Sequence, residues 1–513
     1  MLRQKRLKQE SPARMSVKGR ILLSDNNDNN NNNNNNDNGP ETPENKAGVM
    51  PENKMGVMPI KKLLVNMSLP PMISMLAAAL YNIIDSIFVA RISEDSLTAL
   101  TLVFPMQMFM IAVSTGTGVG LASLISRRLG EKNQADADSA ATHGFVLAVL
   151  VWVLFALFAV FLARPFLRFF TGEEYGEIFE MALIYCRIVM IGSISICFSI
   201  AIEKILQATG NTFYPMLFNV VGIGVNCVLA PILIIGYFGV PQLGVAGAGY
   251  AAVIGQTTGL CVALCLFLSK RHAVRVRFRG FRVRFQTIYD ILVVGAPTML
   301  MQAIMPVLIS SLNKLLFAYE SAVFILGVYY RVSTFAILPV LGMNQGALPI
   351  MGYNFGAKNR LRLLATFKDA FIIALIIMII ATVLVWIFPD RIMMLFSADG
   401  NTLDMGIHAF RSISLAWTPG AFVIISVGLF QAIAHGGFAL IIALVRQFGF
   451  ILPIAYILLI NFGVNSVWYS YPIAEIGALV LAAVFWHRIN RKEIKTLPDG
   501  APATGSPDLE PTL

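Results

Sequence analysis

Three carboxylic acids, Asp85, Glu203 and Glu475, lie well inside long apolar stretches of this 513-residue chain. Placing a charged side chain in lipid is costly, so such acids usually face a cavity, a partner or an ion pathway. Tyr81 and Asp85 are four residues apart and would share one face of a helix. The residue types therefore predict cation binding or proton transfer within an apolar scaffold.

The composition identifies the class of scaffold. Apolar residues make up 56% of the chain and charged residues only 13%, whereas soluble domains carry about 25% charged residues. This balance excludes an ordinary soluble enzyme, a disordered protein and a nucleic-acid binder. It predicts an all-α polytopic membrane protein in which helices position the acids.

Apolar segments long enough to cross a bilayer as helices recur along the chain. We predict twelve transmembrane helices, at 63–90, 97–124, 138–163, 178–206, 213–236, 244–268, 288–317, 321–348, 365–388, 403–432, 438–461 and 464–487. Several contain proline, for example Pro70, Pro297 and Pro419, and such breaks are tolerated where neighbouring helices or water bond the freed backbone groups.

Lysine and arginine gather in alternate loops. Fourteen of these basic residues lie in loops that follow even-numbered spans. The loops that follow odd-numbered spans contain only Arg91, Arg164, Arg168 and Arg391. In membrane proteins, basic residues concentrate in the short loops on the cytoplasmic side of the membrane. We therefore predict a multi-pass protein of the cytoplasmic (inner) membrane with both termini in the cytoplasm. Topology also explains the basic run at 270–284 better than nucleic-acid binding does, and we expect no nucleic-acid partner.

The two ends of the chain differ from the rest. Residues 26–38 contain 11 Asn, and the octapeptide at 43–50 is repeated almost unchanged at 51–58. Because such a sequence cannot bury a core, we expect residues 1–59 to be a disordered Asn-rich cytoplasmic tail that transport does not require. Residues 489–513 are expected to form a second cytoplasmic tail.

The chain contains an internal repeat with an offset near 225 residues. SRRLGEKN at 126–133 corresponds to GYNFGAKN at 352–359, and LQA at 206–208 corresponds to FQA at 430–432. Two sets of six spans in the same orientation predict parallel repeats, with lobes at 60–268 and 288–488 and a basic cytoplasmic linker at 269–287. Transporters that alternate between two access states have this architecture.

Four runs resemble the multidrug and toxic compound extrusion (MATE) family: 126–133, 203–212, 345–359 and 472–475. The resemblance covers about residues 60–488 and implies two six-helix lobes arranged as a V. It also implies a cation-coupled secondary antiporter that exports organic, often cationic or amphipathic, compounds. Its partners would be those small molecules and the lipid bilayer, and we expect a monomer.

The resemblance also suggests coupling-ion residues. Asp85 corresponds to an acid that binds the coupling ion in one branch of the family, and Asn226 begins a pattern that commonly continues to Asp-Pro. Here Ala230 precedes Pro231, so the second carboxylate of that pattern is absent. With fewer oxygen ligands for Na⁺, we favour H⁺ over Na⁺ as the coupling ion, and we expect no cofactor and no metal.

Five further residues are candidates for the substrate cleft or an ion relay: Tyr81, Glu203, Arg331, Gln345 and Glu475. Lys204 follows Glu203 directly, and adjacent side chains point apart on a helix, so Glu203 can face the cavity. The alternative is that Glu203 and Lys204 form a pair at the membrane interface. Arg331 would repel a cationic substrate in the cleft, so we expect the cations inside spans to pair with acids or carbonyl groups.

Other functions fit the sequence less well. Gly116-Thr-Gly-Val-Gly120 lacks the flanking strand and the lysine of a nucleotide loop, and small residues four apart predict close helix packing instead. The histidines and cysteines are scattered, which argues against an enzyme and against a metal cluster. A flippase for lipid-linked sugars of the same wider superfamily is the alternative, and a membrane scaffold or receptor would transport nothing.

Overall fold

The computed structural model describes residues 54–90, 94–171, 176–239, 241–269, 272–396 and 400–499, all within the compact unit Glu52–Leu513. The first half of this unit, here called the N-lobe, contains α2 (Ile60–Ala90), α3 (Glu94–Gly130), α4 (Gln134–Leu157), α5 (Ala163–Thr171), α6 (Gly176–Ile191), α7 (Ile194–Ala208), α8 (Phe213–Pro231) and α9 (Gly244–Ser269).

The second half, the C-lobe, contains α10 (Phe285–Leu316), α11 (Glu320–Gly356), α12 (Arg360–Ile387), α13 (Pro389–Leu395), α14 (Gly400–Ser414), α15 (Trp417–Ala432), α16 (Gly436–Leu444), α17 (Leu452–Phe462) and α18 (Ser470–Ile489). Short π-helical turns, such as η5 (Val445–Ile451), continue several of these helices.

The described helices confirm the predicted polytopic class. Eleven are long and apolar enough to cross a membrane, and the pair α14 and α15, bent by 43° at its break, gives a twelfth when it is counted as one span. The bend follows from Pro419 in the first turn of α15, because proline has no N–H and its ring clashes with the preceding turn. Each of the twelve spans overlaps one predicted segment.

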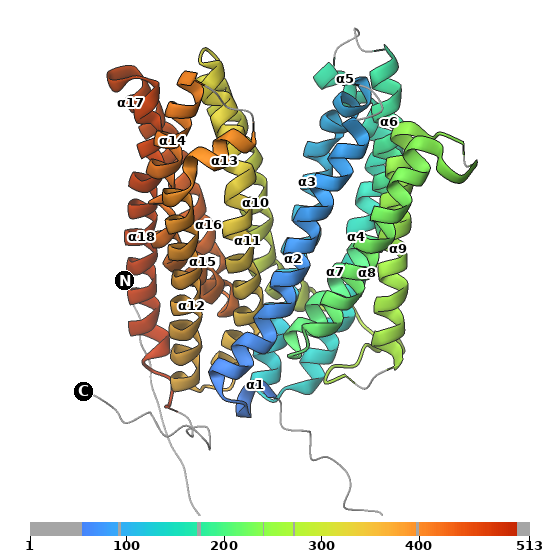
Figure 1. The fold of residues 1–513 in the computed structure, drawn as a ribbon. Coiled ribbons are helices and arrows are strands. Elements are labelled where there is room, and N and C mark those ends of the chain that lie inside the picture. Colours follow the sequence, from blue (N-terminus) through green and yellow to red (C-terminus); the bar gives the residue numbers. More distant parts are fainter. Residues whose placement is uncertain are drawn as a thin grey trace, which may run out of the picture. The chain divides into compact units, whose positions relative to one another are not determined.

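The lobes meet at one end, which we call the basic end because it carries Arg127, Arg128, Lys132 and Lys358. Figure 1 shows α1 (Lys54–Val57) at this end, with α2–α9 in one bundle and α10–α18 in the other. The bundles diverge toward the end that carries α5 and α13. Two lobes joined at one end are the arrangement that the sequence predicts.

The repeat motif has the same local structure in both lobes. α3 and α11 end at Gly130 and Gly356, and the lysine two residues later has a positive φ, 58° at Lys132 and 55° at Lys358. The next residue, Asn133 or Asn359, then caps the following helix through its side chain. The left-handed residue ends one helix and the asparagine begins the next.

One boundary of the predicted N-terminal tail is wrong. Residues 54–57 form α1, and the side chain of Met55 is fully buried. The guanidinium of Arg362 donates to the backbone carbonyls of Met55 and Met58, at 3.1 and 2.7 Å. Apolar burial and a charged donor therefore fix this segment against the C-lobe, whereas residues 1–53 lie outside the described part of the chain.

Candidate functional site

Glycines bring the backbones of the two lobes into contact at the basic end. A Cβ atom at Gly116 or Gly120 of α3 would overlap Met299 or the carbonyl oxygen of Ile291 on α10. This confirms that the Gly116–Gly120 run packs helices closely.

The corresponding glycines of the second repeat make the reciprocal contact. A Cβ at Gly342 or Gly346 of α11 would overlap Met72 or Ser68 on α2. At the helix ends, Gly130 abuts the carbonyl oxygen of Tyr353, and Gly356 abuts that of Arg127. The junction therefore follows the pseudo-twofold symmetry of the two repeats.

A buried ammonium group lies in this junction. Lys204 of α7 is 3% exposed, and its Nζ atom donates to Gln207 Oε1 at 2.9 Å and to Glu203 Oε1 at 3.0 Å in its own lobe. Its third bond, of 2.9 Å, reaches Gln345 Oε1 on α11 of the opposite lobe. The ammonium has three donors and three oxygen acceptors, so its desolvation is offset by complete bonding.

Two features of α3 and α7 make room for this side chain. A Cβ at Gly118 would lie 2.7 Å from Lys204 Cγ, so the lysine stem runs across a position that only glycine leaves open. Gln207 is one helical turn after Glu203 and Lys204, and its Nε2 atom donates to both Glu203 Oε1 and Gln345 Oε1, at 3.0 and 3.3 Å. The side-chain amide of Gln207 thus links the Glu203 carboxylate to Gln345 of the other lobe.

The carboxylate of Glu203 accepts hydrogen bonds through both of its oxygen atoms. Its Oε2 atom accepts a hydrogen bond of 3.0 Å from Asn219 Nδ2 on α8, and its side chain is 15% exposed. The structure thus brings together two sequence candidates, Glu203 and Gln345. Of the two arrangements left open for Glu203, the structure shows the pair with Lys204, because the four-carbon stem of lysine can fold back along the helix to the neighbouring acid.

A second buried carboxylate lies in the C-lobe. Glu475 of α18 is 7% exposed, and Arg446 in η5 donates to its Oε2 atom at 3.3 Å. A Cβ at Gly420 of α15 would lie 3.3 Å from Glu475 Oε1, so this glycine leaves space for the acid. The pairing expected for cations inside spans therefore holds for Arg446.

Aromatic side chains pack one turn from Glu475. The hydroxyl groups of Tyr330 and Tyr471 are 3.0 Å apart, and Trp417 Nε1 donates to the hydroxyl of Tyr329 at 3.4 Å. The rings of Tyr329 and Tyr471 meet edge to face at 5.5 Å. This cluster joins α11, α15 and α18 and combines flat apolar faces with hydroxyl groups.

Of the remaining candidates, the structure describes the side chains of Arg331 and Asn226 only. Arg331 is exposed on α11 and, among the described residues, forms no ion pair. Asn226 is 6% exposed and packs against Gly255 where α8 meets α9. Tyr81 and Asp85 belong to α2, but their side chains lie outside the described part of the structure.

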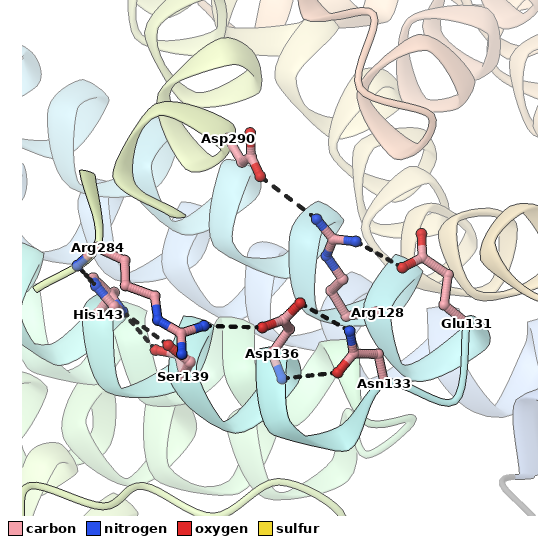
Figure 2. A network of polar contacts seen from close by, with 8 residues as sticks. All are labelled: Arg128, Glu131, Asn133, Asp136, Ser139, His143, Arg284 and Asp290. Atoms are coloured by element: carbon pink, nitrogen blue, oxygen red, sulfur yellow. Dashed lines mark hydrogen bonds and ion pairs between the residues drawn. The ribbon is translucent and has the colours of Figure 1, made fainter. Parts of the chain in front are cut away.

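Salt bridges reinforce the junction at the surface of the basic end. Figure 2 shows Arg128 of α3 between Glu131 and Asp290 of α10, with N–O distances of 2.8 and 3.6 Å. It also shows Arg284, just before α10, paired with Asp136 of α4 at 3.2 Å. These partly exposed pairs contribute little individually, on the order of 0–1 kcal/mol. The Arg128–Asp290 pair joins α3 to α10 of the other lobe, and the Arg284–Asp136 pair ties the start of α10 to α4.

Both buried carboxylates are therefore neutralised from within, Glu203 by Lys204 and Glu475 by Arg446. A cation can use either acid only by displacing the internal partner or by waiting until that partner moves. No group of three or more His, Cys, Asp or Glu side chains suited to a metal ion occurs in the described part of the chain. The arrangement suits reversible ion exchange rather than bond-breaking chemistry.

Comparison with known proteins identifies the family. The MatE family model matches residues 70–232 and 291–457, so it recognises each lobe separately. The chain belongs to the multidrug and toxic compound extrusion (MATE) family. The two matches also confirm the repeat that the sequence predicts.

Several MATE relatives cover most of the chain. The multidrug export protein MepA of Staphylococcus aureus is 25% identical over 421 residues, which are 80% of this chain and 90% of that protein. An outward-facing multidrug resistance MATE transporter of the MOP superfamily is 29% identical with a TM-score of 0.81. A MOP superfamily transporter from Pyrococcus furiosus is 28% identical with a TM-score of 0.79, and each alignment covers 86% of this chain and 98% of that structure.

Family membership decides between the classes of function. MATE proteins are membrane transporters, which confirms that this multi-pass chain is a transporter of small molecules and not an enzyme. The curated relatives and the outward-facing structure are described as multidrug proteins. They do not favour the flippase alternative.

Proposed function

We propose that this MATE protein is a secondary active antiporter that exports organic cationic or amphipathic compounds in exchange for protons. Two features support the proposal: relatives over 80% of the chain are named multidrug export proteins, and one largely buried acid, Glu203, adjoins the contact between the lobes. Na⁺ is the alternative coupling ion. Ala230, in place of a second carboxylate, supports the proton.

We propose that the basic end faces the cytoplasm, with both termini on that side of the cytoplasmic membrane. The excess of lysine and arginine in the loops at this end supports this orientation. A monomer then contains both lobes and the whole junction. In this orientation the described arrangement, joined at the basic end, is the outward-facing state.

The contact that carries the proposal is the bond between Lys204 and Gln345 across the junction. When the lobes part at the basic end to admit cargo, Lys204 loses its third acceptor and gains access to water. The Glu203 carboxylate can then attract a cationic compound that arrives from the cytoplasm. Closure at the basic end restores the Lys204 ammonium as the internal counter-charge and releases the cargo outward.

Asp85 is proposed to carry the proton, near Asn226. Thr212 at the start of α8 donates to the backbone carbonyl of Asn66 in α2, so these positions are level. Asn226 is as many residues beyond Thr212 in α8 as Leu80 is beyond Asn66 in α2. Asn226 and Leu80 therefore lie at a similar height along the two helices. Asp85 follows within two turns, and α2 packs on α8. The backbone of α2 at Asp85 and that of α8 at Asn226 therefore belong to one region of the N-lobe.

Dye efflux tests the proposal in proteoliposomes of uniform orientation. An imposed proton gradient should drive efflux of cationic dyes, a Na⁺ gradient alone should not, and Asp85→Asn should abolish the driven component while the protein still folds and inserts. Neutral and anionic dyes serve as matched cargo. Efflux that needs Na⁺ and ignores pH would contradict proton coupling, and unchanged efflux by Asp85→Asn would contradict the role of this acid.

A further inference from the structure

The segment that connects the lobes is bound along α4 by its own backbone. We call residues 274–284, between α9 and α10, the arginine strap. The backbone N–H groups of Arg275, Arg277 and Arg284 donate to Asp138 Oδ1, Thr142 Oγ1 and His143 Nε2, at 2.9, 3.2 and 2.8 Å. Side chains on one face of α4 thus hold an irregular segment that, among the described residues, pairs with no strand.

This attachment sets which side chains point outward. Successive side chains of an extended segment point to opposite sides. Val274 is 2% exposed and Val276 packs against the core, whereas Arg275, Arg277 and Arg279 are exposed. Val274 and Val276 therefore face the protein and Arg275 and Arg277 face outward, and exposed Arg279 stands in the turn that follows.

The outward arginines have no acidic partner among the residues that the structure describes. Arg284 pairs with Asp136, but among the described residues no ion pair involves Arg275, Arg277, Arg279 or Arg282. Two exposed aromatic rings flank these cations, Phe278 at 62% and Phe285 at 83% exposure. The excess of positive charge in cytoplasmic loops explains why arginines occur in this loop. It does not explain why the backbone is bonded to α4 so that Arg275 and Arg277 face outward.

The strap also lies at the boundary of the membrane. The candidate spans that flank it end at Ser269 and begin again at Phe285. Arginines beside aromatic rings at such a boundary suit the zone of lipid headgroups, where phosphate groups accept from guanidinium and rings enter the interface. We propose that the arginine strap is a preorganised binding site for the headgroups of anionic phospholipids in the adjoining leaflet.

Native mass spectrometry of the full-length protein with phosphatidylglycerol and phosphatidylcholine tests this proposal. The variant Arg275→Gln/Arg277→Gln/Arg279→Gln should weaken phosphatidylglycerol binding about a hundred-fold, since each basic residue near an anionic surface contributes about five-fold. Phosphatidylcholine binding should be unchanged. The matched control is Arg491→Gln/Lys492→Gln/Lys495→Gln, which removes the same charge from exposed residues of the C-terminal segment.

Asp138→Ala separates a fixed site from general charge attraction. It makes the protein more positive by one charge but removes the acceptor for the Arg275 N–H. A preorganised strap predicts weaker phosphatidylglycerol binding in this variant, and general attraction predicts tighter binding. The proposal is overturned if Asp138→Ala binds more tightly, if the control triple variant loses as much as the strap variant, or if the strap arginines affect binding of an oligonucleotide and not of phosphatidylglycerol.

Discussion

The Nζ atom of Lys204 in the N-lobe and the Oε1 atom of Gln345 in the C-lobe are 2.9 Å apart, at the point where α7 faces α11. A buried charge in one lobe thus depends on an uncharged acceptor in the other. Because Glu203 and Gln207 supply the other two acceptors from α7 itself, separation of the lobes removes one of three bonds. Lys204 then keeps two acceptors, and a cation that reaches Glu203 can displace it. The contact favours closure at this end without locking it.

Replacing Gln345 by leucine should favour opening at the basic end. Lys204 would keep two acceptors and bury one unsatisfied donor, which costs about 1–3 kcal/mol. Pulsed electron spin resonance between labels at Glu131 and Lys492, in a background without native cysteines, would report a longer distance or a new population. Gln286→Leu, which removes an exposed amide that bonds Asp290, is the control and should leave the distance distribution unchanged.

The charges of Glu203 and Lys204 should be strongly coupled. Glu203→Gln or Lys204→Gln alone leaves an uncompensated buried charge and should cost about 3–5 kcal/mol, whereas the double variant should cost less than either. The midpoint of thermal unfolding in detergent measures all three. Additive losses would show that the pair is not coupled.

Transport measurements should distinguish the effect of the charge of Glu203 from the effect of its packing. If cargo cations use this carboxylate, Glu203→Gln should reduce efflux of cationic dyes more than of neutral dyes of the same size. Asn219→Ala, which removes only the amide bonded to Glu203 Oε2, should have a smaller and less selective effect. Equal loss of both dye classes in Glu203→Gln would indicate a structural role.

The spans and the repeat could be predicted because they depend on composition and local motifs. The lengths of the apolar segments predicted the twelve spans. The motifs around Gly130 and Gly356 share the residues that end one helix and begin the next. The internal repeat also includes glycines that the prediction did not compare. Gly342 and Gly346 correspond to Gly116 and Gly120 under the same offset, and they make the reciprocal interlobe contact.

Contacts between distant helices could not be predicted from local pattern. Glu203 and Gln345 were candidates, but a bond of Lys204 to both depends on the crossing of α7 and α11 and on the space left by Gly118. The partner of Glu475 likewise comes from a different helix, because Arg446 lies in η5. The burial of Met55 was missed because a short segment rich in charge and glycine contains no periodic apolar face.

Gly120 should be intolerant of even a methyl group. In Gly120→Ala the new Cβ would overlap the carbonyl oxygen of Ile291, so the lobes must separate or shift. We expect a lower thermal midpoint together with greater labelling of cysteines introduced at the basic end. Gly327→Ala on α11 is the matched control, since nothing lies within 4 Å of its added Cβ, and it should be neutral or stabilising by up to about 1 kcal/mol.

Ala434→Gly should stabilise the protein. Ala434 follows α15 with φ of 65°, while the N–H of His435 bonds back to Phe430 O at 2.7 Å, so a left-handed residue ends this helix. Glycine removes the Cβ strain at this position but has more freedom in the unfolded chain, which leaves a net gain of roughly 0.5–1 kcal/mol. Ala357→Gly is the control, because its φ of −72° is ordinary for alanine; there the thermal midpoint should not rise.

Shortening the N-terminus should be harmless only as far as α1. A chain that begins at Met50 keeps Met55 and the carbonyl groups bonded by Arg362, so it should insert, unfold and transport like the full chain. A chain that begins at Met58 loses the fully buried Met55 side chain and one acceptor of the Arg362 guanidinium. Removing a buried methionine costs about 2–5 kcal/mol, so this chain should have a clearly lower thermal midpoint, and Met55→Ala in the full chain should reproduce much of the loss. If both shortened chains are as stable as the full chain, the contact of α1 with the C-lobe contributes nothing, and the tail is dispensable through residue 57.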